Sequence, residues 1–195
     1  MMRRSSMKLK GTEDLRIRRT ITSLKRAFEE LICEKEYSEI TVTELSDRAV
    51  INKKTFYQYY KNLDELLDEL TSDFSSRYLE EIAKYQIPED LEQINRTFFT
   101  FSAGAGKVYD RMILSGNQDI LQKNFMEQTM RDYWHRSQWF MSFPENVRSI
   151  LFQYVQNATI GIYQQWVVDS RKLPLEELVQ LSYNLIYQGI NSLLF

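Results

Sequence analysis

The sequence of 195 residues has few of the side chains that metal sites and many catalytic sites need. Its single cysteine, Cys33, excludes an internal disulfide framework and a zinc site built from several cysteines. Its single histidine, His135, excludes a metal site built from several histidines. We therefore expect no metal, no cofactor and no redox role for Cys33.

Glycine, proline and long apolar runs are also scarce. Six glycines and three prolines argue against collagen, long flexible linkers and turn-rich β-sandwiches. No apolar run approaches the roughly 20 residues of a membrane span, and the charged N-terminus lacks the apolar stretch of a secretory signal. At 43% hydrophobic residues the chain can bury a core, so we expect a folded cytoplasmic protein without a membrane partner.

Charge is unevenly distributed along the chain. Residues 1–61 hold 14 Lys and Arg against 9 Asp and Glu, a net charge of +5. Residues 62–195 hold 11 Lys and Arg against 18 Asp and Glu, a net charge of −7. A basic segment attached to an acidic body is typical of a chain that offers one end to a polyanion, although a solvated basic tail gives the same pattern.

Almost every stretch has helical periodicity. Apolar residues from Ile17 to Leu31 recur at steps of three and four, which predicts a helix over 13–35. Similar stripes predict a long helix over 62–85 and further helices over 89–103, 106–115, 117–141, 144–169 and 174–194, with a kink or break at Gly104 and Gly106. The sequence thus predicts an all-α fold of about nine helices, with a head at 1–61 and a larger body at 62–195.

Between the first helix and the long helix lie two short, capped segments. Thr41 with Glu44 can begin a helix that reaches about Ala49, and Asn52 can begin a second that reaches Tyr60. Two short helices joined by a tight turn after a longer helix are typical of a helix-turn-helix that reads DNA. The second has a polar face suited to a major groove and an apolar face, Phe56 and Tyr60, that would hold it in place.

Residues 41–67, TVTELSDRAVINKKTFYQYYKNLDELL, resemble the DNA-binding head of the tetracycline-repressor (TetR) family. The resemblance lies in the Thr-led helix, the alanine before the turn, the Thr-Phe-Tyr segment and the Lys-Asn opening of the next helix. The match to the whole head, of which these residues are the most specific part, covers about the first third of the chain. It implies a dimeric transcriptional repressor that binds a palindromic operator in double-stranded DNA and is released when an effector bound in the body shifts the long helix.

The resemblance also implies roles by position. Thr43, Lys53, Lys54, Thr55 and Gln58 would approach bases; Tyr57, Tyr59 and Lys61 would hold phosphates, and Asn52 would cap the reading helix and present backbone N–H groups to phosphate. The arginines of the first helix would meet the DNA backbone or the minor groove, and these are Arg16, Arg18 and Arg19.

Two residues depart from the family pattern. Val50 stands where the turn commonly has glycine, and a β-branched residue at positive φ is costly, so the turn must be of a kind that valine tolerates or be strained. Leu63 stands where a lysine often follows the Lys-Asn pair, which predicts the loss of one phosphate contact. The effect of either departure is open.

The body offers a candidate dimer face. Two apolar stripes with small residues lie in helices 144–169 and 174–194, and such stripes serve equally as intramolecular core or as a four-helix dimer interface. We favour the homodimer because a single head makes few phosphate contacts. The expected interface residues are Leu151, Tyr154, Ala158, Gly161, Ile162, Leu178, Leu185 and Gly189.

Aromatic residues and methionines are dense between residues 98 and 143. A pocket for a small hydrophobic or aromatic effector needs such a lining, and so does an ordinary core. With the family precedent, we expect an effector to contact Phe98, Phe101, Tyr109, Met112, Phe125, Met126, Met130, Tyr133, Trp134 and Trp139.

Two other classes of function, an enzyme and a protein-binding adaptor, compete with a transcriptional regulator. An enzyme is disfavoured because the sequence shows no Ser or Cys nucleophile with an orienting histidine, His135 being the single histidine. A phosphate-binding loop is also missing, because Gly104 and Gly106 are not followed by Lys and Ser or Thr. A helical protein-binding adaptor, or an activator of the same family without a small-molecule inducer, remains the alternative. The sequence leaves the effector, the operator, the regulated genes and the sign of regulation open.

Overall fold

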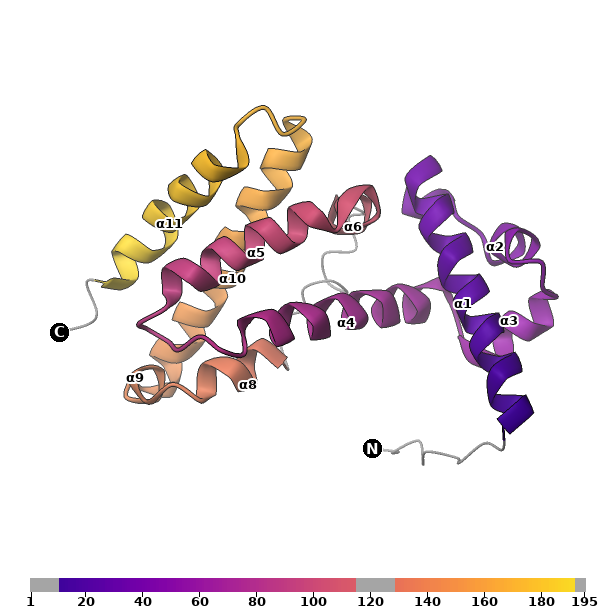
Figure 1. Ribbon diagram of the computed structural model, residues 1–195, viewed down its shortest axis with the longest axis horizontal. Coiled ribbons are helices and arrows are strands. Elements are labelled where there is room, and N and C mark those ends of the chain that lie inside the picture. The colour runs from indigo at the N-terminus through magenta and orange to yellow at the C-terminus, as the bar shows by residue number, and fades with distance from the viewer. Residues whose placement is uncertain (1–10, 115–128, 192–195) are drawn as a thin grey trace. The chain divides into compact units, whose positions relative to one another are not determined.

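The computed structural model describes residues 11–114 and 129–191 (Figure 1). Within these ranges the chain forms ten α-helices, one short 3-10 helix and no strand, which confirms the all-α prediction. The helices are α1 (Gly11–Glu34), α2 (Val42–Arg48), α3 (Lys53–Tyr59), α4 (Leu63–Ile82), α5 (Leu91–Gly104), α6 (Gly106–Leu114), α8 (Thr129–His135), α9 (Gln138–Met141), α10 (Glu145–Val168) and α11 (Leu175–Asn191), with the 3-10 helix η1 at Tyr37–Glu39.

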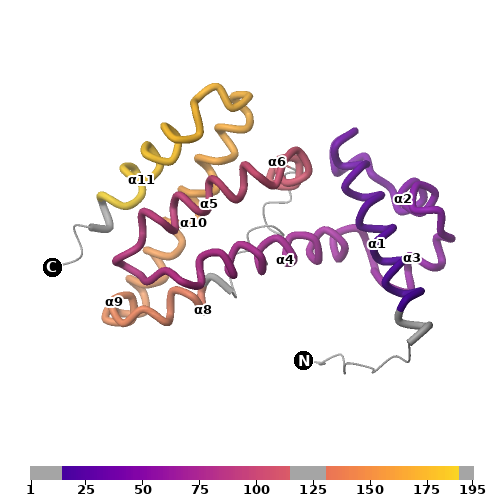
Figure 2. The backbone as a smooth tube through the Cα atoms, viewed as in Figure 1, coloured from indigo at the N-terminus to yellow at the C-terminus, as the bar shows by residue number. Residues whose placement is uncertain are grey.

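The chain divides into two compact units, Met1–Leu66 and Leu67–Phe195, here called the N-terminal and C-terminal units. The sequence places this boundary at residue 61, before α4, whereas the structural division falls inside that helix. Figure 2 follows the backbone from α1 through α3 within the N-terminal unit and from α5 through α11 within the C-terminal unit.

The N-terminal unit is built on the stripe of α1. Leu24, Phe28 and Leu31 are fully buried, and they are the residues whose spacing predicts the amphipathic helix. The buried residues of α2 and α3 include Leu45 and Phe56, and α2 packs against both α1 and α3. Each short helix thus contributes a fully buried apolar residue to this core.

The short helices begin where their capping residues stand. Thr41 Oγ1 accepts a hydrogen bond from the Glu44 backbone N–H at 3.2 Å, and Asn52 Oδ1 accepts one from Lys54 N–H at 2.8 Å. Asn62 Oδ1 accepts from Glu65 N–H at 3.0 Å at the start of α4. Each bond satisfies an N–H that the helix itself leaves unpaired, so these three starts are fixed by local chemistry.

In the C-terminal unit α10 and α11 pack against each other, and α11 packs along α5 (Figure 1). A buried amide fastens that last pair: Asn95 Nδ2 donates to the Val179 carbonyl at 3.1 Å and to Ser182 Oγ at 2.9 Å. Tyr133 of α8 donates its hydroxyl proton to the carbonyls of Ile82 and Tyr85, at 3.2 and 2.9 Å. Buried polar groups that are paired in this way fix the register of helices that otherwise meet through apolar side chains.

The helix predicted over 117–141 is wrong for the part that the structure describes. α8 ends at His135 and α9 begins at Gln138, because Ser137 adopts an extended backbone and caps α9 by accepting from Phe140 N–H at 3.2 Å. Ser137 also donates to the Ile87 carbonyl at 2.7 Å, a tertiary contact that continuous periodicity could not indicate. Residues 117–128 of that prediction lie outside the described residues.

Candidate nucleic-acid interface

The candidate interface is formed by α2, α3 and the turn between them. Phe56 on the inner face of α3 is fully buried and packs against the tilted ring of Tyr60, with 5.7 Å between the centroids. Ala49, at the end of α2, is also buried, and its carbonyl accepts a hydrogen bond from Ser23 Oγ of α1 at 2.9 Å. The inner face of α2 is thus held against α1, and α3 packs on α2, which leaves the outer face of the two helices to carry polar groups.

The outer face presents most of the residues that the sequence assigns to DNA. Thr43, Lys53 and Gln58 are exposed, as are Asn52 and Lys54, whereas Thr55 and Tyr59 are half-buried. Lys53 Nζ lies 3.2 Å from Thr43 Oγ1, so the first turns of α2 and α3 meet. A hydroxyl, an amide and two ammonium groups therefore share one face of the helix-turn-helix, and these groups bond well to phosphates and base edges.

The remaining predicted contacts lie around this face. Tyr57 is exposed and packs edge-on against Phe56 at 5.4 Å. Lys61 is exposed and forms an ion pair with Glu65 at 3.0 Å. An exposed pair of this kind contributes little to stability, so a phosphate can replace the carboxylate at small cost. Arg16, Arg18 and Arg19 are exposed on α1.

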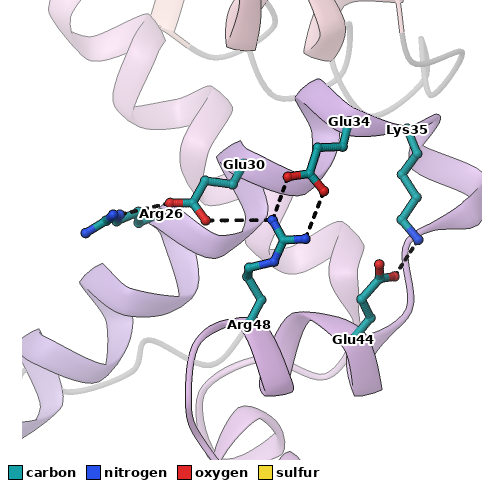
Figure 3. A network of polar contacts seen from close by, with 6 residues as sticks. All are labelled: Arg26, Glu30, Glu34, Lys35, Glu44 and Arg48. Atoms are coloured by element: carbon teal, nitrogen blue, oxygen red, sulfur yellow. Dashed lines mark hydrogen bonds and ion pairs between the residues drawn. The ribbon is translucent and has the colours of Figure 1, made fainter.

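Other cations of the N-terminal unit are taken up by carboxylates (Figure 3). Arg48 of α2 makes a two-pronged contact with Glu34 of α1, with N–O distances of 2.7 and 2.8 Å, and Arg26 of α1 pairs with Glu30 at 3.0 Å. This network, together with a Lys35–Glu44 ion pair, fastens α1 to the α2 segment. Arg26, Lys35 and Arg48 are therefore engaged by carboxylates of the same unit, which the net charge of +5 already counts.

The same network changes the pKa values of Glu34 and Arg48. The hydrogen bonds from Arg48 lower the pKa of Glu34, and the bond to Glu34 raises the pKa of Arg48. Both groups are at the surface, where solvent screens the interaction. The sequence contains no local signal for this pair, because the two residues lie fourteen positions apart.

The turn between α2 and α3 contains Val50, the residue at which the sequence analysis anticipates backbone strain. Val50 adopts φ +56° and is 90% exposed, so its β-branched side chain gains nothing from packing. Its backbone closes the turn: Val50 N–H donates to the Asp47 carbonyl at 3.1 Å and Ile51 N–H to the Ser46 carbonyl at 3.0 Å. Of the two alternatives that the sequence allows, the structure shows the strained turn.

The residues predicted to contact an effector do not line one common pocket in the described part of the chain. Phe98, Tyr109, Met112, Tyr133 and Trp134 are buried, and Phe101 and Trp139 are half-buried. Tyr109 stacks on Phe74 at 4.0 Å, and Phe98 packs edge-on against Tyr78 at 5.8 Å. Met130 lies in α8, and Phe125 and Met126 lie outside the described residues. The side chains around Phe98 and Tyr109 therefore form packed core.

Tyr133 and Trp139 of the predicted set instead line a groove of about 480 Å³. It lies between the segment after α4, residues 83–89, and the α8–α9 corner, and it also exposes Tyr85 and Arg136 to the opening. Burial raises the pKa of Tyr133 to about 12, so its hydroxyl stays protonated near neutral pH. The groove combines the ring surfaces of Tyr85 and Trp139 with the Arg136 guanidinium and the Glu89 carboxylate, which suits a ligand that is partly apolar and partly polar.

One partly buried polar link in the C-terminal unit was not predicted. Arg171, after α10, contacts both carboxylate oxygens of Asp110 in α6 at 2.8 and 2.6 Å, and the Tyr163 hydroxyl donates to the same carboxylate at 2.8 Å. Burial, and after it the bond to Asp110, raises the pKa of Tyr163. The guanidinium also lies over the Trp166 ring at 4.9 Å. No sequence signal joins residues 53 or 61 positions apart.

Comparisons with known proteins agree with this geometry. No protein-family profile matches the chain. The dhaKLM operon transcriptional activator DhaS of Lactococcus lactis subsp. lactis (strain IL1403), described as HTH-type, is 26% identical over 173 residues, which are 85% of this chain and 87% of that protein.

Solved structures match nearly the whole chain. A TetR transcriptional regulator from Streptococcus agalactiae 2603V is 22% identical and aligns with a TM-score of 0.63 over 89% of this chain and 97% of its own. The regulator FadR from Bacillus subtilis, solved in complex with stearoyl-CoA, is 20% identical and aligns with a TM-score of 0.63 over 86% of this chain and 98% of its own. The chain has the TetR-family fold.

The TetR-like C-terminal unit leaves an apolar stripe exposed on α10. Ile150 is 68% exposed, and Tyr154, Gly161 and Val168 are exposed with it. At 3.6 residues per turn these four positions lie on one side of the helix. The Tyr154 hydroxyl donates to the Leu185 carbonyl of α11 at 3.0 Å, so the stripe continues onto α11, where Leu185 and Leu181 are exposed.

The exposed stripe differs in part from the predicted dimer residues. Leu151 and Leu178 are buried in the core of their own chain. On α10 the exposed face carries Ile150 in place of Leu151, and on α11 it carries Leu181 in place of Leu178. Tyr154, Gly161 and Leu185 are exposed as a dimer contact requires, and Ala158 and Ile162 are half-buried at its margin. Gly189 lies in α11.

Within the described residues no helix combines the length and the apolar character that crossing a membrane requires. The same residues contain no cluster of three or more His, Cys, Asp and Glu side chains arranged to hold a metal ion.

Proposed function

We propose that the protein is a transcriptional regulator of the TetR family that binds double-stranded DNA as a homodimer. The observation that carries this proposal is the exposed face shared by Thr43, Lys53 and Lys54, held in place by the buried Phe56. A polar helix fixed by an apolar inner face is what entry into a major groove requires. The fold neighbours, which are regulators and not enzymes, support the same function.

The homodimer would place two such faces on one duplex. The proposed interface is the stripe of Ile150, Tyr154, Leu181 and Leu185 on α10 and α11. A two-fold pair of α3 helices would meet two half-sites of a palindromic operator, and it would double the number of phosphate contacts that one chain makes.

We propose repression relieved by a small hydrophobic effector as the mode of regulation. FadR from Bacillus subtilis was solved with stearoyl-CoA, which supports a ligand-responsive body in this fold. In the present chain the groove lined by Tyr133 and Trp139 supports an effector with an apolar part. Binding would lower operator affinity only if the effector prefers the conformation that does not fit the operator.

Activation is the second candidate, because the relative that is 26% identical is named a transcriptional activator. Deleting the gene and measuring the transcripts of its neighbours separates the two modes. Under repression the regulated transcripts rise on deletion, and under activation they fall.

DNA binding itself is tested by fluorescence anisotropy with duplexes from the region upstream of the gene. The double variant K53A/K54A should lose specific binding, because two cations leave the α2–α3 face. The control K107A removes one exposed lysine from α6 and should bind as the wild type does. Equal binding by K53A/K54A and the wild type, with both proteins folded by circular dichroism, would refute the proposal.

A further inference from the structure

The groove between the segment after α4 and the α8–α9 corner carries two side chains of opposite charge, Glu89 and Arg136 (Figure 1). Glu89 belongs to the segment after α4, and Arg136 directly follows α8, so the charges come from two separate parts of the chain. Both side chains are exposed, and neither forms an ion pair with another side chain of the described residues. The groove therefore offers a guanidinium and a carboxylate that a ligand can use.

The other polar groups at this groove are already hydrogen-bonded. Asp90, the neighbour of Glu89, accepts a hydrogen bond from the Gln86 backbone N–H at 2.9 Å. The Tyr133 hydroxyl donates to two backbone carbonyls at 3.2 and 2.9 Å, and the Ser137 hydroxyl donates to a third at 2.7 Å. These bonds hold the walls together, so ligand charge is left to the guanidinium and the carboxylate.

Two half-buried rings, Tyr85 and Trp139, supply the apolar surface of the groove. Lys84 Nζ lies 5.0 Å from the centroid of the Tyr85 ring, and Trp139 packs edge-on against Phe143 at 5.1 Å. The Trp139 indole N–H has no acceptor among the described residues, so a ligand oxygen that reached it would satisfy an unpaired donor. Aromatic surface of this kind favours a ligand with a ring or a branched apolar body.

The charge balance of the lining selects among ligands. The lining carries one positive and one negative charge, and water solvates both in the free protein because both side chains are exposed. A ligand that covers the groove removes water from both groups. A purely cationic ligand then leaves the guanidinium uncompensated, and a purely anionic ligand leaves the carboxylate uncompensated. A ligand with one charge of each sign compensates both.

We propose that this groove binds a zwitterion, namely an amino acid with an apolar or aromatic side chain. Arg136 would hold the ligand carboxylate through paired, charge-assisted hydrogen bonds, and Glu89 would hold the ammonium group. The volume of about 480 Å³ lies in the range of small-molecule sites. That the bound amino acid is also the effector rests on the proposed function, whereas its binding does not.

Isothermal titration calorimetry of the full-length protein without DNA tests the proposal with three ligands that share one ring. Phenylalanine carries both charges, 2-phenylethylamine lacks the carboxylate, and 3-phenylpropionate lacks the ammonium group. All three keep their charges at neutral pH. Phenylalanine should bind about fivefold more tightly than either of the other two, because each of them leaves one charge of the groove uncompensated.

Two variants assign each preference to one side chain. R136Q should abolish the preference for phenylalanine over 2-phenylethylamine and keep the preference over 3-phenylpropionate. E89Q should do the reverse, because it removes the partner of the ammonium group. The matched controls R148Q and E145Q remove the same charges outside this groove and should keep both preferences.

The proposal is overturned if the wild type binds none of phenylalanine, tryptophan and leucine at millimolar concentration. It is also overturned if R136Q and E89Q show the same order of ligands as the wild type. Duplex binding measured with and without phenylalanine tests the effector role separately. A failure of DNA binding, or a duplex affinity that phenylalanine leaves unchanged, would count against the proposed function, while the calorimetric result would still establish the site.

Discussion

At the residue scale, Val50 shows how one side chain can oppose the fold around it. Its φ of +56° belongs to the left-handed region, where a β-branched residue is strained by about 1–2 kcal/mol, and its exposed side chain gains no compensating contact. The backbone hydrogen bonds of the turn and the buried helices on either side hold it there. The sequence indicated the problem correctly, because glycine is the residue that such a turn prefers.

The variant V50G should therefore be more stable than the wild type. We expect a gain of about 0.5–1 kcal/mol, since the relief of strain exceeds the extra entropy of an unfolded glycine. V50A, which keeps a Cβ but loses the branch, should gain less. Thermal denaturation of the three proteins checks this order, and a V50G protein less stable than the wild type would show that Val50 contributes a contact.

At the element scale, helix starts were predictable and tertiary pairings were not. Thr41, Asn52 and Asn62 cap their helices through bonds that span two or three residues, so the local sequence contains the whole signal. The Ser137 corner and the Arg48–Glu34 pair depend on residues far apart in the chain. The sequence also could not decide which of two adjacent apolar residues, such as Ile150 and Leu151, faces the core. Turning the helix about its axis by the angle between successive residues would bury one and expose the other.

The clamp between α1 and α2 should depend on pH. Since the pKa of Glu34 is lower in the folded state, its contribution is complete above the unfolded value of about 4.3 and is lost as the pH falls through the folded value. The melting temperatures of wild type and R48M should therefore differ at pH 7 and converge as the pH falls through the lowered pKa of Glu34. The control K107M should show no such convergence, and a constant gap between wild type and R48M would contradict the assignment.

The partly buried link from α6 to the end of α10 should be worth more than a surface pair. In the Asp110–Arg171 pair the side chains are 15% and 34% exposed, whereas in the Arg96–Glu176 pair they are 43% and 70% exposed. We expect D110N to cost about 2–3 kcal/mol, because Arg171 and Tyr163 lose a shared charged acceptor. E176Q should cost less than about 0.5 kcal/mol. Chemical denaturation compares the two variants, and equal costs would show that the Asp110–Arg171 pair contributes no more than a surface pair.

At the scale of the whole molecule, the all-α fold follows from periodicity, and the proposed assembly follows from what remains exposed after folding. Ile150 and Leu185 are 68% and 58% exposed, so a single chain gains little from their apolar surface. The sequence could locate the two helices of this face. It could not separate exposed from buried leucines, since that depends on how α10 and α11 pack together.

The double variant I150E/L185E should be folded and monomeric. Both side chains are exposed in the single chain, so the substitutions leave its core intact, while two carboxylates per chain would repel across a two-fold interface. Sedimentation velocity measures the oligomeric state. L15E, which adds the same charge at an exposed apolar residue of α1, should remain dimeric. A dimeric I150E/L185E protein would place the interface elsewhere.

The central claim is that the α2–α3 face contacts DNA through its lysines, and the salt dependence of duplex binding tests it most directly. Each phosphate contact contributes about −0.9 to the slope of log Kobs against log salt concentration for duplex DNA. K54A should therefore reduce the steepness of the slope by about one unit for each half-site bound, and K107A should leave it unchanged. A K54A slope equal to that of the wild type, or no salt dependence at all, would contradict the account.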